Sequence, residues 1–176
     1  MKAVKTPNFH SNQGFTLVEL VVVILILGIL AATALPKFMN VNTEAHEAAV
    51  AGAGGGLGAG VALVHAQWVA NGTDAADGDV ANFGLGTVAV NSSGWPTDSP
   101  TDTTTLSTAT HCMNVWNGVM QNPPTVATSG TATDYTVAID GGSATGCIFT
   151  YNGKSNMTIT YESSTGAVTV DADSSS

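Results

Sequence analysis

Glu19 is the residue whose position most clearly calls for a chemical role. It is the one charged side chain in the apolar run from Phe15 to Leu35, FTLVELVVVILILGILAATAL. A carboxylate inside an apolar, membrane-length segment costs several kcal/mol unless it finds a partner. We therefore treat Glu19 as a functional residue whose partner has to be identified.

A few other side chains are of the types that bind metals or take part in catalysis. Asp74, Asp77 and Asp79 offer oxygen atoms of the kind that calcium binds, although their spacing differs from that of an EF-hand loop. His46, His65 and His111 lack the paired spacing of a zinc site. His111 beside Cys112 suggests a thiol nucleophile, but a disulfide would consume the sulfur. No hydrolase or nucleotide-binding signature is present. The sequence therefore predicts no enzyme, and no cofactor beyond a candidate calcium ion.

The composition limits both the size of the fold and the class of partner. A chain of 176 residues is long enough for one modest domain and one long element. It has 4 Lys and Arg against 13 Asp and Glu, for a net charge of -9. Such an acidic chain repels nucleic acid, so nucleic acid is not an expected partner.

The apolar run has two ordinary interpretations. As a helix it is about 31 Å long, which is enough to cross a bilayer core. Lys2 and Lys5 precede it and only Lys37 follows closely, which favours keeping the leading end in the cytoplasm. The run could be a signal peptide cut near Ala32–Ala34, or a plain membrane anchor. Neither interpretation accounts for Glu19.

The residues around Glu19 carry a family resemblance. Gly14-Phe15-Thr16-Leu17-Val18-Glu19-Leu20 resembles the processing site of type IV prepilins. In that family a dedicated peptidase cuts after the glycine on the cytoplasmic side, and the new N-terminal residue is methylated. The resemblance implies cleavage between Gly14 and Phe15 by a prepilin peptidase/N-methyltransferase, with Phe15 N-methylated. The new ammonium at Phe15 could pair with Glu19 of its own or a neighbouring subunit. The Glu19 carboxylate, which is costly when alone, would then fix the axial register between neighbouring helices of an assembly.

The same resemblance implies an α+β type IV pilin fold, in which one long N-terminal helix packs on a C-terminal antiparallel β-meander. Gly28 and Pro36 are the positions where we expect the helix to bend, because glycine and proline weaken a helix interior. The expected parts are a cleaved leader (1–14), a membrane-spanning half-helix (15–36), an amphipathic half-helix (37–70) and a globular head (71–176).

An apolar row continues the helical pattern beyond Pro36. Its members are spaced by three or four residues, which indicates a helical stripe that packs on the sheet of the head. The row consists of Phe38, Val41, Ala45, Ala49, Ala53, Leu57, Val61, Val64 and Trp68. We expect the helix to end near Ala70.

The glycine-rich stretch at residues 51–60, AGAGGGLGAG, leaves two alternatives. Its glycines would cost an isolated helix about 6 kcal/mol relative to alanine, which favours a flexible linker after Val50. Alternatively, Gly52, Gly56 and Gly60 form a bare ridge at a spacing of four, which allows another backbone to approach closely. We favour a helix held by packing against the sheet or a neighbouring subunit.

The rest of the head is predicted to be short strands and one short helix. Residues 97–108 are rich in Thr and Ser and predict a surface loop. Asn152-Gly153 is a dipeptide typical of tight hairpins. The predicted elements are strands at Thr87–Val90, Tyr135–Asp140, Cys147–Tyr151, Met157–Glu162 and Ala167–Asp171, and a helix at Ala109–Met120. The apolar face of the meander needs a cover, and the long helix provides it.

Cys112 and Cys147 are the two cysteines of the chain. In an exported head they predict one disulfide, whereas in a cytosolic protein they would be buried thiols. The disulfide would tie the short helix to the second strand of the meander. In type IV pilins a C-terminal disulfide bounds a displayed region, which implies that residues 112–147 lie near the filament exterior.

The functional prediction is a structural subunit of a type IV pilus for attachment. Gly94-Trp95-Pro96-Thr97 and Cys112–Gly118 are similar to segments of mannose-sensitive haemagglutinin pilins. The implied partners are other pilin subunits and the assembly machinery of the inner membrane. The precursor would sit in that membrane with its head in the periplasm, and the product would be extracellular. The alternatives are a pseudopilin of a type II secretion system and a monomeric binding domain released after Ala34.

Overall fold

The computed structural model describes residues 15–72, 79–84, 86–99, 104–141, 145–154 and 156–173. The chain divides into two compact units, Met1–Val41 and Asn42–Ser176. The first unit contains the N-terminal part of one long helix. The second contains the rest of that helix and all the strands.

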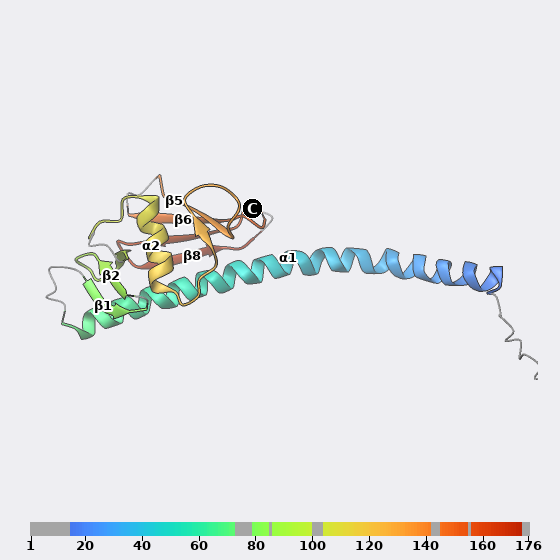
Figure 1. The fold of residues 1–176 in the computed structure, drawn as a ribbon, viewed down its shortest axis with the longest axis horizontal. Helices are drawn as coiled ribbons and strands as arrows, with labels where there is room; N and C mark the ends of the chain where they lie inside the picture. Colours follow the sequence, from blue (N-terminus) through green and yellow to red (C-terminus); the bar gives the residue numbers. More distant parts are fainter. Residues whose placement is uncertain are drawn as a thin grey trace, which may run out of the picture. The chain divides into compact units, whose positions relative to one another are not determined.

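The long helix, α1, runs from Leu17 to Ala70 over 54 residues (Figure 1). It passes through the glycine-rich stretch 51–60 without a break, which confirms the helical alternative for that stretch. It also continues through Gly28 and Pro36, so the bends expected there remain predictions. The large apolar side chains between Phe15 and Leu35 are all exposed. By length and composition, α1 is able to cross a membrane.

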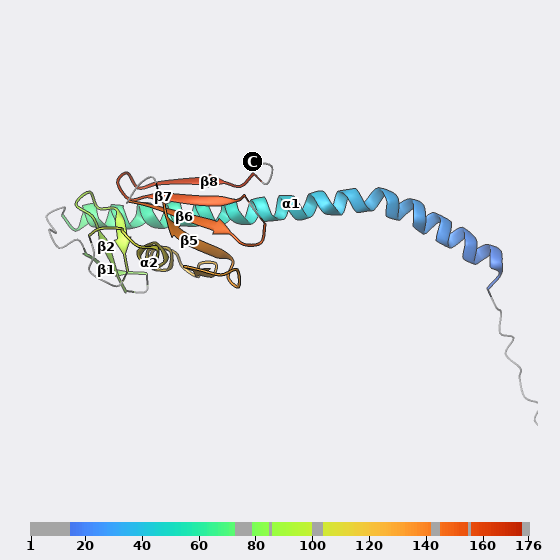
Figure 2. The same ribbon diagram turned by 90° about the horizontal axis from the view of Figure 1, so that it is seen from above.

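A five-stranded sheet forms the larger layer of the head. Its order is β4-β5-β6-β7-β8, and Figure 2 shows β5 to β8 side by side over α1. The strands from β5 onward pair antiparallel with their neighbours in sequence, which confirms the predicted meander. Strand β4 pairs parallel with β5 and was not predicted, because two residues carry no periodic signal. The bounds are β4 (Val126–Ala127), β5 (Tyr135–Ile139), β6 (Gly146–Tyr151), β7 (Thr158–Glu162) and β8 (Ala167–Asp171).

A smaller antiparallel sheet has the order β1-β2-β3. Its strands are β1 (Asp79–Phe83), β2 (Gly86–Val90) and β3 (Pro96–Asp98). The prediction of a surface loop from residue 97 is therefore wrong at its start, since Thr97 and Asp98 are each 1% exposed. Thr97 Oγ1 donates to the carbonyl of Ala89, and Asp98 Oδ1 accepts from Asn114 Nδ2 at 2.8 Å. Polar side chains can be buried when their hydrogen bonds are made internally.

The short helix, α2, runs from Ala109 to Val119 and confirms the helix predicted there. Thr108 is its N-cap, and Thr108 Oγ1 accepts a hydrogen bond from the backbone N–H of His111. The helix turns Cys112, Val115 and Trp116 into the core.

The core of the head lies between α1, α2 and the sheets. Val50, Leu57, Val61 and Val64 supply the buried face of α1. On the other side Trp116 meets Phe149 and Tyr135, with ring centroids 4.5 and 5.0 Å apart.

The predicted apolar row is correct from Ala53 onward and wrong before it. Phe38 is 72% exposed and Val41 is 58% exposed, and Ala45 and Ala49 are also exposed. The reason is geometric, because each step of four residues rotates the row by about 40° around the helix. Val41 therefore lies about 160° around the helix from Leu57.

The close packing of α1 explains two of its glycines. A Cβ added at Gly54 would lie 2.2 Å from Val170 Cγ2 on β8, and one at Gly60 would lie 2.4 Å from the carbonyl oxygen of Val119. A Cβ at Gly52 or Gly55 would meet nothing within 4 Å. Glycine is therefore required for packing inside the chain at Gly54 and Gly60, but not at the other two positions.

The connection between β6 and β7 is longer than the predicted two-residue turn. The backbone N–H of Tyr151 donates to the carbonyl of Met157 at 3.0 Å, and Asn156 adopts a left-handed conformation with φ of 72°. Asn152 instead donates from Nδ2 to the carbonyl of Thr133 at 2.8 Å. The side chain of Asn152 thus holds this connection against the segment that precedes β5.

We predict opposite effects of alanine at two glycines of α1. Gly60→Ala should lower the free energy of unfolding by about 1–3 kcal/mol, because the new Cβ meets backbone that cannot move freely. Gly55→Ala should raise it by about 0.5–1 kcal/mol through helix propensity alone. Denaturant unfolding of the full-length protein in detergent, followed by tryptophan fluorescence, measures both. Equal stabilisation by the two variants would contradict the packing argument.

Candidate functional site

The first turn of α1 is organised by Thr16 and Glu19. The backbone N–H and the Oγ1 hydroxyl of Thr16 both donate to Glu19 Oε2, at 2.8 and 2.9 Å. The backbone N–H of Glu19 donates back to Thr16 Oγ1 at 3.2 Å. This reciprocal arrangement is a capping box, in which the residue before the helix and the third helical residue satisfy each other's N–H groups.

The capping box supplies the partner that Glu19 lacks in the bare sequence. The Thr-x-x-Glu spacing was visible there, and our sequence reasoning missed Thr16. Both bonds to the carboxylate end on Oε2, and within the described part of the chain no hydrogen bond reaches Oε1. One carboxylate oxygen is therefore committed to the helix start, and the other is open to a further donor.

The predicted processing residues lie directly before this box. Phe15 precedes Thr16 and its side chain is 91% exposed, whereas Gly14 lies outside the described residues. The N–H and hydroxyl donors of the box belong to Thr16. Cleavage between Gly14 and Phe15 would therefore leave them in the mature chain.

Comparison with known proteins finds matches to this N-terminal region. A family described as the prokaryotic N-terminal methylation motif matches residues 9–35. These residues include Gly14, Phe15 and Glu19. A Thermus thermophilus protein named type IV narrow pilus major component PilA5 is 50% identical over 38 residues. Both matches support the resemblance of this N-terminal segment to type IV prepilins.

The matched region is short. It covers 22% of the chain and 33% of the Thermus protein, so the chain spans about a third of that relative's length. No solved structure matches the chain at a significant level. Neither match confirms the narrower resemblance to mannose-sensitive haemagglutinin pilins.

The calcium candidate receives no support from the described residues. Asp74 and Asp77 lie outside them, and Asp79 is the first residue of β1. In the part of the chain that the structure describes, no group of three or more His, Cys, Asp or Glu side chains could hold a metal ion.

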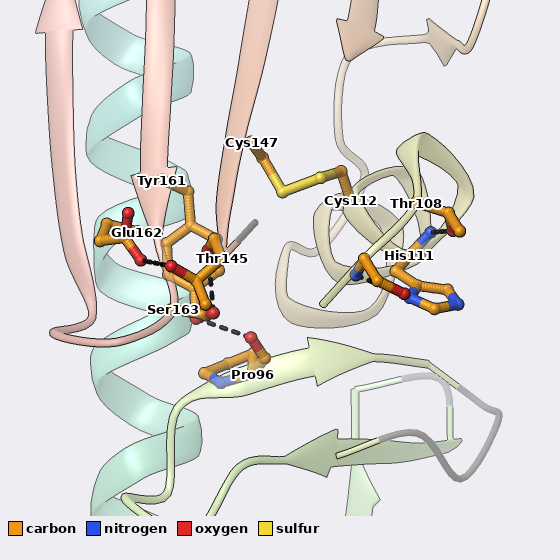
Figure 3. The surroundings of a disulfide bond; sticks show 10 residues. Pro96, Thr108, His111, Cys112, Thr145, Cys147, Tyr161, Glu162 and Ser163 are labelled. Carbon is orange, nitrogen blue, oxygen red and sulfur yellow. Dashed lines mark hydrogen bonds between the residues drawn. A yellow bond between two sulfur atoms is a disulfide. The ribbon is translucent and has the colours of Figure 1, made fainter. Parts of the chain in front are cut away.

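The head is held by the predicted disulfide between Cys112 on α2 and Cys147 on β6 (Figure 3). Their Cα atoms are 5.7 Å apart, and both residues are fully buried. Because α2 and β6 belong to different layers, the disulfide fixes α2 against the five-stranded sheet. Its burial also shields it from thiol reagents in solution.

A hydrogen bond beside the disulfide joins the two sheets. The Tyr161 hydroxyl, on β7, donates to the carbonyl of Pro96 on β3 at 2.7 Å (Figure 3). Burial, and then the neighbouring charge of Glu162, raise the pKa of Tyr161, so the hydroxyl keeps its proton and remains a donor. No local pattern in the sequence predicts this bond, because it joins residues 65 positions apart.

We predict that removing the disulfide weakens the head without changing its fold. The Cys112→Ala, Cys147→Ala double variant should lose about 3–4 kcal/mol of unfolding free energy, because the open chain regains entropy when it unfolds. Denaturant unfolding with and without reductant measures the effect. Reductant, once it has reduced the disulfide of the wild-type protein, should lower its free energy of unfolding to the same extent, and it should leave the variant unchanged. An unchanged midpoint in the variant would contradict the prediction.

Proposed function

We propose that this chain is the precursor of a structural subunit that polymerises into a type IV pilus used for attachment. The observation that carries the proposal is the first turn of α1. There a lone carboxylate is held in a capping box at the start of an exposed apolar helix. The name of the Thermus relative, type IV narrow pilus major component PilA5, supports the same function.

In the proposed pathway, the leader 1–14 is removed and Phe15 becomes an N-methylated terminus. Glu19 Oε2 stays in the capping box. Glu19 Oε1 accepts a hydrogen bond from the Phe15 ammonium of the same or a neighbouring subunit. A charge in an apolar environment is tolerated when it is paired and hydrogen-bonded. The pair would therefore favour one axial register between neighbouring helices.

Polymerisation would cover the apolar surface that the chain leaves exposed. The helices from Phe15 to Leu35 bundle into a core, and the heads form the outer wall. Each subunit uses different surfaces toward successive neighbours, so the contacts do not close and a fibre results. The precursor resides in the inner membrane with its head in the periplasm, and the fibre is extracellular. We propose no catalytic residue and no cofactor for this role.

Mass spectrometry of the N-terminus, on filaments sheared from the cell surface, tests processing and display together. We expect a chain that begins at methylated Phe15. The same terminus found only in membranes would favour the pseudopilin of a type II secretion system, which forms a short periplasmic fibre. A start at Leu35, or an uncut Met1, would overturn the proposal.

Two substitutions at Glu19 separate its charge from its capping role. Glu19→Gln keeps an amide oxygen for Thr16 and so keeps the box, whereas Glu19→Val removes both functions. We expect both variants to reach the membrane and to lower the filament yield by about tenfold or more, as expected if pairing contributes ~1.4 kcal/mol or more. Quantitative immunoblots of sheared and membrane fractions give the yields. Normal filaments from Glu19→Gln would show that capping, and not charge pairing, is what assembly needs.

A further inference from the structure

Three aromatic rings gather where the end of α1 meets two turns of the head. His65 and Trp68 belong to α1, and Trp95 directly precedes β3. The rings of His65 and Trp95 are nearly parallel, with centroids 3.9 Å apart and an interplanar angle of 12°. The centroids of His65 and Trp68 are 5.6 Å apart, at an angle of 28°. His65, which is half-buried, is therefore stacked on the face of one indole and lies close to a second.

Two glycines bring turn backbone directly against the indoles. A Cβ at Gly94, between β2 and β3, would lie 2.2 Å from Trp68 Cε3. A Cβ at Gly166, between β7 and β8, would lie 2.2 Å from Trp95 Cε3. Both glycines have positive φ, 78° and 73°, a conformation that glycine adopts at little cost. The stack of His65 on Trp95 thus joins α1 to both turns.

A hydrogen bond decides which nitrogen of His65 carries a proton. His65 Nδ1 lies 3.3 Å from the carbonyl oxygen of Gly94. Because a carbonyl oxygen only accepts, Nδ1 is the donor, and Nε2 is the nitrogen that takes up a further proton. Protonation at Nε2 leaves the bond to Gly94 in place and makes it charge-assisted.

His111 provides a contrast within the same head. Its Nδ1 accepts a hydrogen bond from the backbone N–H of Ser107 at 3.2 Å, so the neutral ring carries its proton on Nε2. Protonation of His111 at Nδ1 would remove that acceptor. The two histidines therefore respond to acid in opposite ways, since the contacts of His65 persist and the contact of His111 is lost.

The charges of the surrounding segments do not oppose a positive ring at His65. Residues 48–70 of α1 and residues 91–95 contain no Asp, Glu, Lys or Arg. The turn that packs on Trp95, residues 162–166, contributes one charged side chain, the carboxylate of Glu162. An imidazolium in this place therefore meets an aromatic face and a turn that bears negative charge.

We propose that His65 is a proton-binding site that tightens this end of the head in acid. The protonated ring keeps its bond to Gly94 and makes a cation–π contact with Trp95, because the face of an indole attracts a cation. The added stability is present at acidic pH, where the ring is charged, and is lost as the pH rises and the ring becomes neutral. The inference concerns the head alone and does not depend on polymerisation.

The first test is denaturant unfolding of the full-length protein in detergent, at about pH 5 and about pH 8, the range in which histidine changes its charge. The comparison variant is His65→Gln, whose side chain is polar but never charged. Acidification should change the folding equilibrium constant more favourably in the wild type than in His65→Gln, by about two- to fivefold. His111→Gln, the matched control, removes a histidine outside the stack and should keep this gain. A wild-type response equal to or smaller than that of His65→Gln would overturn the proposal.

A second measurement uses the wild-type protein and so does not depend on the folding of a variant. Nitrogen NMR spectra of protein labelled at its histidines distinguish the two neutral tautomers, and Overhauser contacts to the Trp95 ring assign the signals of His65. At about pH 8 we expect the proton of neutral His65 on Nδ1 and that of His111 on Nε2. A neutral His65 with its proton on Nε2 would show that the bond to Gly94 is absent, and it would overturn the proposal.

Discussion

The head depends on how closely α1 approaches β8 and the end of α2. At Gly54 the helix lies against Val170, and at Gly60 it lies against the carbonyl of Val119, with no space for a side chain at either point. This approach brings Leu57, Val61 and Val64 against the sheet and buries them. A sheet with one apolar face needs such a cover, and a helix with larger residues at these points would stand too far away.

The other contacts of the head build on that layer. Once α1 covers the sheet, Trp116 packs on Phe149 in the interior, and the disulfide holds α2 in place beside them. Tyr161 then links β7 to β3 through the carbonyl of Pro96. Each of these contacts joins segments far apart in the sequence. Together these contacts stabilise one arrangement of helices and sheets in a head that has few charged groups and a modest apolar core.

One helix meets two different requirements in this chain. Its first half is apolar on all sides and suits a membrane or a bundle of like helices, and Glu19 is tolerated there because Thr16 donates to it. Its second half buries one face in the head and presents small residues on the other. In the first half the capping box stabilises a carboxylate that an apolar helix would otherwise disfavour. In the second half close packing stabilises a glycine-rich stretch that would otherwise weaken the helix.

The sequence by itself determined the features that depend on neighbouring residues. Periodicity and turn residues were enough for the membrane-length helix, the short helix at Cys112 and the four meander strands, and the motif at Gly14, Phe15 and Glu19 was identified by its resemblance to prepilins. The capping box also depends on local spacing alone, because Thr16 and Glu19 are three residues apart. Only the tertiary structure decided which face of α1 is buried, because a row of four-residue steps drifts around a helix. It also decided that Thr97 and Asp98 are buried, that Tyr161 bonds Pro96, and which glycines make close contacts, since each depends on partners brought together by the fold.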